Sequence, residues 1–96
     1  MKIPDKVRVA GIEYKVSLTD DFSDVKIGTI DYHNAEILIK TDVAVDVQKW
    51  TFYHELLHAM LTAIGYKVND KIILDEPFID AMASQLHCVM DNMIKD

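Results

Sequence analysis

The chain has 96 residues, half of them hydrophobic, and its sixteen acidic and ten basic side chains give a net charge of −6. This length allows one domain at most, residues 1–96, and the hydrophobic content excludes an intrinsically disordered chain. The acidic balance and the scattered lysines exclude a phosphate-binding surface, so we expect no nucleic-acid partner. No stretch approaches the ~18 uninterrupted apolar residues of a membrane span.

The N-terminus and the cysteine content bear on the cellular compartment. The opening segment, MKIPDKVRVAG, lacks the apolar run of a secretory signal peptide. Cys88 is the one cysteine, so the chain cannot form an internal disulfide, which is typical of a reducing compartment. We therefore expect a soluble, cytoplasmic protein in which Cys88 is a small apolar side chain and not a nucleophile.

The first part of the chain follows the alternation of β-strands. Residues 6–18 place apolar side chains at alternate positions on both sides of Gly11, which predicts two short strands or one strand bent at the glycine. After a polar loop, residues 26–40 predict a hairpin. Its turn is expected near His33 and Asn34, because asparagine tolerates the left-handed conformation that such turns require.

The second part of the chain has the period of helices. Thr41 or Asp42 is the expected N-cap of a first helix that is apolar nearly all round, and therefore buried, and Gly65 is its expected end. A second helix is expected to start near Pro77. The apolar stripe expected to face the first helix is Ile79, Met82, Leu86, Val89 or Met90, and Met93. This order predicts an α+β fold, with a small, mostly antiparallel sheet of three or four strands followed by two packed helices.

The segment YHELLHAM, residues 53–60, places His54 and His58 four residues apart with Glu55 between them. On a helix these histidines lie ~40° apart around the axis, so both imidazoles can reach one zinc ion, which in catalytic sites keeps a position for water. Glu55, rotated ~100° from His54, would act as general base toward the water on that metal. The alternative is a pair of helix histidines whose nitrogens are satisfied by hydrogen bonds in the core.

A third ligand must come from another part of the chain. The downstream candidates are Asp70, Asp75, Glu76 and Asp80. Glu76 stands at the start of the second helix, which must pack back against the first. Asp80 lies one turn further on the same face, where its carboxylate could accept the free ring N–H of a ligating histidine.

The metal motif and its surroundings resemble a known group of enzymes. HELLH followed by EPFID resembles the gluzincin pattern of thermolysin-type metallopeptidases, His-Glu-x-x-His and then Glu-x-x-x-Asp. Through GIEYKV, GTIDY and EILI as well, nearly the whole chain is similar to small phage- and prophage-type metallopeptidases related to the ImmA/IrrE group.

This resemblance implies a minimal zincin-like domain that hydrolyses peptide bonds. It implies one Zn²⁺ ion on His54, His58 and Glu76, with Glu55 as the base and Asp80 holding a ligating histidine from behind. The substrate it implies is a peptide or an intracellular protein, such as a phage or prophage regulator, in the host cytoplasm if the protein is phage-encoded.

Four features leave alternatives open. Pro77 disfavours helical angles at Glu76, which could then be a helix cap, with Asp80 as the reserve ligand. The chain lacks the second subdomain of a thermolysin-type cleft, so a zinc-stabilised interaction module without turnover is the alternative function. Tyr66 is a possible oxyanion stabiliser, although its position after the helix favours packing. The strand at 36–40, if it is a sheet edge, could pair with an extended substrate.

The other chemistry-bearing side chains have structural interpretations. We expect His33 to be a turn residue and Trp50 to belong to the core. His87, two turns after Asp80, is expected to be a half-buried helix histidine that could add to the surroundings of the metal. The sequence leaves the oligomeric state open.

Overall fold

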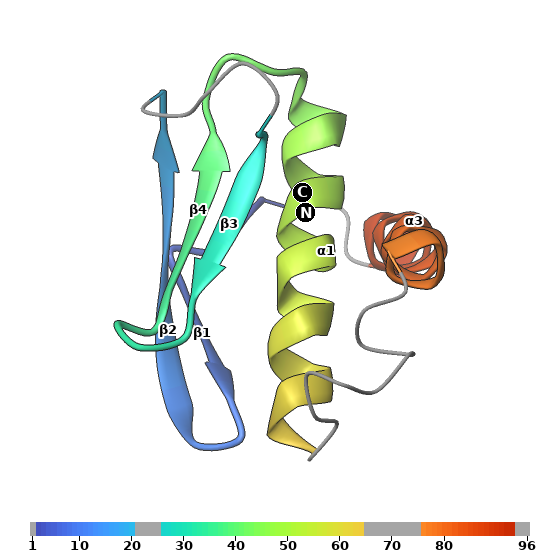
Figure 1. Cartoon of the computed structure of the whole chain (residues 1–96). Helices are drawn as coiled ribbons and strands as arrows, with labels where there is room; N and C mark the ends of the chain where they lie inside the picture. The colour runs from blue at the N-terminus through green and yellow to red at the C-terminus, as the bar shows by residue number, and fades with distance from the viewer. Residues whose placement is uncertain (1, 21–25, 65–75, 94–96) are drawn as a thin grey trace.

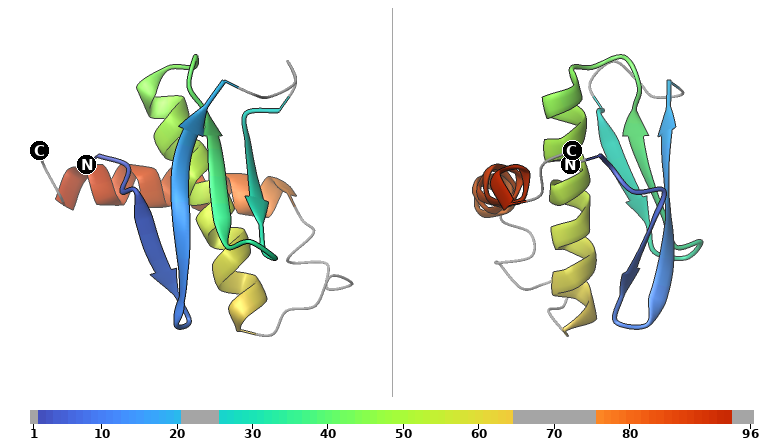
Figure 2. Two further views of the ribbon diagram at one scale, coloured as in Figure 1. Left: turned by 90° about the vertical axis from the view of Figure 1, so that its left-hand side faces the viewer. Right: turned by 180° about the vertical axis from the view of Figure 1, so that it is seen from behind.

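The computed structural model describes residues 2–20, 26–64 and 76–93, and the structural statements below concern these ranges. The elements are β1 (Lys6–Val9), β2 (Ile12–Thr19), β3 (Gly28–Asp31), β4 (Glu36–Lys40), α1 (Val45–Ala63) and α3 (Glu76–Met93). The sheet packs with one face on α1, and α3 runs across α1 on the side away from the sheet (Figures 1 and 2). This order confirms the predicted α+β fold. Neither described helix is long and apolar enough to cross a membrane.

The strand order is β1-β2-β4-β3, with two antiparallel pairs and one parallel pair, β2 with β4. The sheet is therefore mostly antiparallel, as predicted. The suggestion that residues 36–40 form a sheet edge is wrong, because β4 lies between β2 and β3. Ile37 and Ile39 of β4 are fully buried, as suits an inner strand, whereas every residue of β3 keeps some exposure. Within the described sheet the edges are β1 and β3.

The first two strands form a hairpin and not one bent strand. Ala10 and Gly11 both have positive φ, 50° and 83°, which is the requirement of the tight turns that match strand twist. The register then places Val9 opposite Ile12 and Val7 opposite Tyr14. The alternation on both sides of the glycine thus came from two strands.

The second turn, between β3 and β4, lies where the sequence predicted it, but other residues than expected determine its conformation. The carboxylate of Asp31 accepts hydrogen bonds from the backbone N–H groups of His33 and Asn34, at 3.0 and 3.1 Å, and from the Asn34 side chain at 2.8 Å. The left-handed residue is Ala35, with φ 53°, and not Asn34. His33 is an exposed turn residue, as expected.

Helix α1 starts later than predicted. Its N-cap is Ala44, for which the described structure has no side-chain cap, so Thr41 and Asp42 do not cap it. Instead, the side chain of Gln48 reaches back and donates to the Thr41 carbonyl at 2.7 Å. The helix ends at Ala63, and the expected stop at Gly65 lies outside the described residues.

The stripe on α3 that faces α1 is only partly the predicted one. Ile79 and Ala83 are fully buried there, and Leu86 and Met90 pack beside them. Met82 and Met93 are exposed, so their expected place in this stripe is wrong, and of the alternatives Val89 and Met90 it is Met90 that packs there, while Val89 is exposed. The three exposed side chains lie ~60° around the helix from the buried row, because each stands three residues, or ~300° of rotation, after one of its members.

Gly28 gives a first prediction, about packing between the sheet and α1. Its backbone angles would allow a side chain, but a Cβ there would collide with Cγ2 of Thr51, which is 2% exposed. We expect Gly28→Ala to lower the free energy of unfolding by about 1–3 kcal/mol, measured by urea denaturation. Thr51→Ser removes that methyl group and keeps the hydroxyl that donates to Val47. The double variant should therefore be more stable than Gly28→Ala alone, and purely additive losses would contradict this account.

Asp31 gives a second prediction, about stability and pH. Hydrogen bonds from Asn34 hold the pKa of this carboxyl below its ordinary value. Because the folded pKa is depressed, the stabilisation is fully present above about pH 4 and is lost as the pH falls through the folded pKa. Asp31→Ala should thus lower the unfolding midpoint in urea at pH 6 and have a smaller effect near pH 3. An equal effect at both pH values would show that the ionised carboxylate is unimportant.

Candidate metal centre

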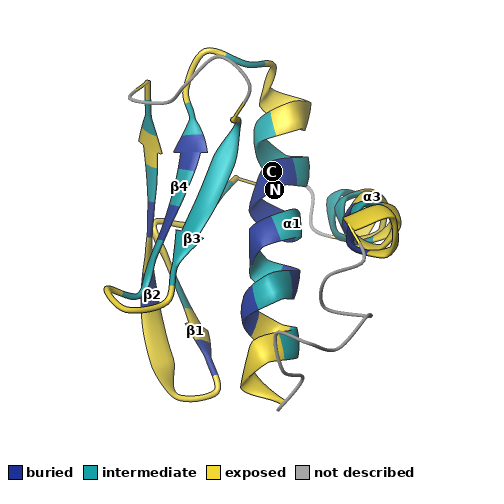
Figure 3. Ribbon diagram, viewed as in Figure 1, coloured by how far each residue is buried: buried dark blue, intermediate teal, exposed yellow. Residues whose placement is uncertain are grey.

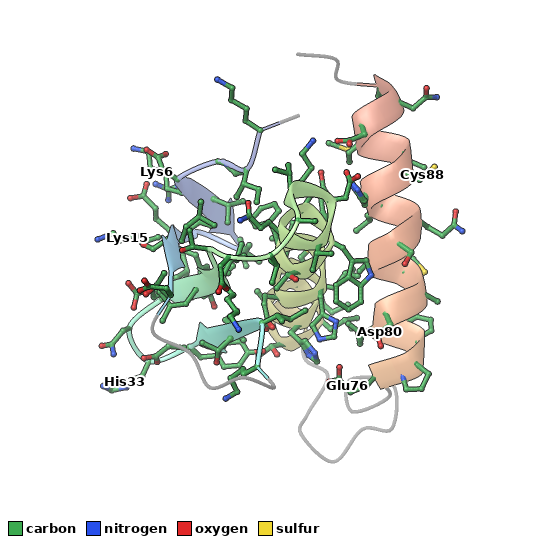
Figure 4. The ribbon with its side chains drawn as sticks, turned by 90° about the horizontal axis from the view of Figure 1, so that it is seen from above. Lys6, Lys15, His33, Glu76, Asp80 and Cys88 are labelled. Atoms are coloured by element: carbon green, nitrogen blue, oxygen red, sulfur yellow. The ribbon has the colours of Figure 1, made fainter. Side chains whose placement is uncertain are left out.

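The middle of α1 and the first turns of α3 bring the predicted site residues together. His54, Glu55 and His58 come from α1, and Figure 4 shows Glu76 and Asp80 at the N-terminal end of α3. The crossing of the helices is held by Trp50, whose indole N–H donates to the Asp80 carbonyl at 3.3 Å and to the Ser84 hydroxyl at 3.1 Å. Trp50 is thus partly buried and joins the two helices that carry the site.

Two imidazoles and one carboxylate converge on a common point. His54 Nε2 lies 3.0 Å from Oε2 of Glu76, and His58 Nε2 lies 3.2 Å from its Oε1. One ligand atom from each residue lies within 4.8 Å of the other two. Ligands ~2.1 Å from a tetrahedral zinc ion lie ~3.4 Å apart, so small movements would accommodate an ion. These three residues could hold one metal ion.

Asp80 faces a different atom of the same histidine. Its Oδ1 lies 2.8 Å from His54 Nδ1, whereas Glu76 faces Nε2. Both His54 Nδ1 and Asp80 Oδ1 are buried and have no other hydrogen-bond partner in the described part of the chain. A carboxylate in this place fixes the ring orientation of a histidine and leaves Nε2 for a metal. The geometry therefore separates the two carboxylates, with Glu76 in the cluster and Asp80 behind it.

The proline after Glu76 does not prevent this arrangement. Glu76 is the first residue of α3, so Pro77 occupies the first turn, where its missing N–H costs nothing. The Glu76 side chain reaches both histidines from the end of the helix. The other candidate ligands, Asp70 and Asp75, and the possible oxyanion stabiliser Tyr66 lie outside the described residues.

The site is less buried than the sequence predicted. The side chains of His54 and His58 are 14% and 15% exposed, and those of Glu76 and Asp80 are about half exposed. The expectation that the first helix is buried nearly all round is therefore wrong at the two histidines. Figure 3 shows the reason: α1 is buried where the sheet and α3 cover it and is less buried between these contacts. Burial still lowers the pKa of His58, which favours the neutral form that binds metals.

Glu55 lies beside the cluster but outside it. It is buried, 8% exposed, and burial raises the pKa of its carboxyl, with a further contribution from the charge of Glu76. Its Oε2 lies close to where a Cβ of Gly28 would be, 3.4 Å away. Glu55 thus faces the start of β3, whereas the histidines face α3.

A pocket of about 290 Å³ joins these groups. Its walls come from His54, Glu55, Glu76 and Asp80, with Trp50, and from a stretch that the sequence analysis did not single out. That stretch is Lys26, Ile27 and Gly28 at the start of β3, with Thr51 opposite. Only Gly28 gave a sequence signal, since glycine in a strand often marks close approach of another group.

A second cluster lies at the other side of α3. His87 Nε2 is 3.3 Å from Asp46, its Nδ1 is 3.7 Å from Asp91, and Lys49 is 3.3 Å from Asp91. Because opposite ring nitrogens face the two carboxylates and a lysine already pairs with one of them, we interpret this cluster as an ion-pair bridge between α1 and α3. His87 is half-buried, as expected, but it contacts this bridge and not the candidate ligands.

The third prediction separates ligands from supporting residues. We expect Glu76→Gln to reduce zinc affinity more than Asp80→Asn, which should cost about 10–100-fold, because Asp80 acts only through His54. Isothermal titration with Zn²⁺ and a competing chelator measures both, and His87→Ala is a control expected to bind as wild type does. A loss for Asp80→Asn as large as for Glu76→Gln would make Asp80 a ligand.

Comparison with known proteins adds no functional assignment to this geometry. No protein-family model matches the chain, and no curated protein and no solved structure matches it significantly. The function is therefore argued from the site itself.

Proposed function

We propose that the protein is a zinc-dependent metallopeptidase that hydrolyses peptide bonds, with Glu55 as general base. The observation that carries the proposal is the convergence of His54, His58 and Glu76 beside a buried carboxylate that is not part of their cluster. Zinc held by these three residues would polarise a carbonyl and make a water molecule acidic enough to react near neutral pH. The proton transfers would be carried out by side chains of the protein.

Glu55 has the properties of a proton carrier. Its burial raises the carboxyl pKa, which brings the group closer to the pH at which proton transfer is efficient. It would take a proton from the attacking water as the water oxygen bonds to the carbonyl carbon. It would then give that proton to the amine as the C–N bond breaks. Gly28 opposite has no side chain to fill the space in which this exchange occurs.

Support for a peptide substrate comes from the edge of the sheet. β3 is an outer strand, and the residues at its start line the pocket that contains Glu55. An extended peptide paired with β3 would run past the candidate ligands. The strand proposed to pair with an extended substrate is therefore Gly28–Asp31 and not residues 36–40.

One observation favours the alternative, a zinc-stabilised interaction module without turnover. The cluster joins α1 to α3, so a bound ion would fasten the outer helix to the rest of the fold. Glu76 and Asp80 are about half exposed, so the described walls of the site are shallow. Both properties suit a structural ion, whose binding energy contributes to folding.

The fourth prediction distinguishes these functions. Glu55→Gln should keep the zinc stoichiometry of the wild type, because Glu55 is not a ligand, and should lose cleavage by about 10²–10⁴-fold. Mass spectrometry of a peptide library incubated with zinc-loaded protein measures cleavage. Glu13→Gln, an exposed change on β2, is the matched control and should cleave normally.

Two other outcomes decide against the proposal. If neither wild type nor Glu55→Gln cleaves any peptide while chelation unfolds both, the ion is structural. If no stoichiometric metal binds to either protein, both functions fail together.

A further inference from the structure

The outward surface of α3 is almost free of charge. Along α3, which is described in full, Glu76 and Asp80 are the charged residues with side chains about half exposed, and both lie in its first turns; Asp80, His87 and Asp91 contact partners on α1. The exposed positions after Glu76 are Pro77, Phe78, Ala81, Met82, Ser84, Gln85, Cys88, Val89, Asn92 and Met93. More than a quarter of the chain is charged, so a helix surface without charge beyond its first turns is unusual in it. Depletion of charge with enrichment of Phe and Met is typical of a protein interface.

Four large apolar side chains form a row on this surface, which we call the outer stripe. They are Phe78, Met82, Val89 and Met93, between 39% and 73% exposed, with Gln85 in the middle of the row. Their spacings of four, three, four and four residues keep them within ~80° around the helix. This is the spacing with which one helix packs against another. Figures 2 and 4 show α3 as the outermost layer, with Cys88 on the side turned away from α1.

The outer stripe is self-complementary. Its residues are symmetric about a point between positions 85 and 86, so an antiparallel copy places Phe78 opposite Met93 and Met82 opposite Val89. Gln85 then meets its own counterpart, and two side-chain amides can hydrogen-bond to each other. An isologous contact about a two-fold axis requires this kind of symmetry.

The lack of charge on the outer stripe favours a second copy of the chain as its partner, and the position of Glu76 favours an antiparallel orientation of the two helices. A partner with charged groups at the contact would leave them desolvated and unpaired against this neutral row, whereas a second α3 brings no charge there. A parallel pair would bring the two Glu76 carboxylates together. An antiparallel pair keeps them ~29 Å apart along the helix axes, beyond the screening distance.

We propose that α3 is a homodimer interface, in which the outer stripes of two chains pack antiparallel about a two-fold axis next to Gln85. The candidate metal centres then lie at opposite ends of the interface and remain accessible. A single helix pair buries less than the ~800 Å² per partner of a standard interface, so we expect dissociation on the order of micromolar concentrations.

Sedimentation velocity under reducing conditions tests the association, and no metal or substrate is needed. Wild type should shift from monomer to dimer as its concentration rises. Val89→Lys should raise the dissociation constant at least about tenfold, because it places a charge in the stripe. Val89→Gln is the milder variant if the lysine disturbs folding, which circular dichroism reports. Wild type that remains monomeric at millimolar concentration would overturn the proposal.

Cysteine cross-linking tests the geometry. In a Cys88→Ser background, Gln85→Cys lies ~1.5 Å along the axis from its counterpart and should form a disulfide-linked dimer on mild oxidation. The control Asn92→Cys is equally exposed but lies ~20 Å from its counterpart in the antiparallel pair, and should stay monomeric. Equal cross-linking of both variants would reject the antiparallel arrangement.

Discussion

The crossing of α3 over α1 is the contact on which the candidate site depends. Ile79 and Ala83 are fully buried in it, and the Trp50 indole fixes its position through two hydrogen bonds to α3. Glu76 precedes Ile79 by three residues and Asp80 follows it directly, so docking of the apolar residues also delivers both carboxylates to the histidines. The free energy gained by burying these apolar side chains thus offsets the cost of bringing together polar groups that would not assemble by themselves.

The sheet contributes to the site through one tight contact. Gly28 lies against Thr51 and near Glu55, and any side chain at that position would push β3 away from α1. The position of β3 is in turn set by its pairing with β4, whose two isoleucines are fully buried. A single glycine therefore relates the sheet to the carboxylate that we propose as the base.

Local patterns in the sequence predicted the elements and the metal motif but not what depends on the assembled fold. Alternation and period located the strands, the hairpin turn and both helices, and the gluzincin-like spacing identified the candidate residues. The order of the strands could not be predicted, because alternation at 36–40 is compatible with either an edge or an inner position. The apolar residues of α3 formed two rows, and only the fold decides which of them faces α1. Nothing in the sequence indicated that Lys26 and Ile27 would form a wall of the pocket.

The hydrogen-bond requirements of His54 are the strongest argument for a cation at the site. Its Nδ1 lies 2.8 Å from one carboxylate and its Nε2 lies 3.0 Å from another, but a neutral imidazole has only one N–H to donate. One of the two contacts would then pair two acceptors, unless the ring is protonated or a cation lies between the atoms. Protonation of His54 alone would satisfy both contacts with one positive charge, whereas protonation of both rings would place two charges side by side, since the ring centroids of His54 and His58 are 5.0 Å apart.

A divalent cation held by His54, His58 and Glu76 would remove the conflict. It would occupy the Nε2 side of His54 and leave the Nδ1–H of that ring for Asp80. It would also balance the charges of three carboxylates, those of Glu55, Glu76 and Asp80. Among the described residues that line their pocket, Lys26 is the one lysine or arginine. Hydrogen bonds from two neutral imidazoles satisfy neither requirement, and a protonated His54 satisfies the hydrogen bonds but supplies only one positive charge. For this reason the metal interpretation of the two histidines is stronger in the folded protein than in the sequence, even though the site is less buried than expected.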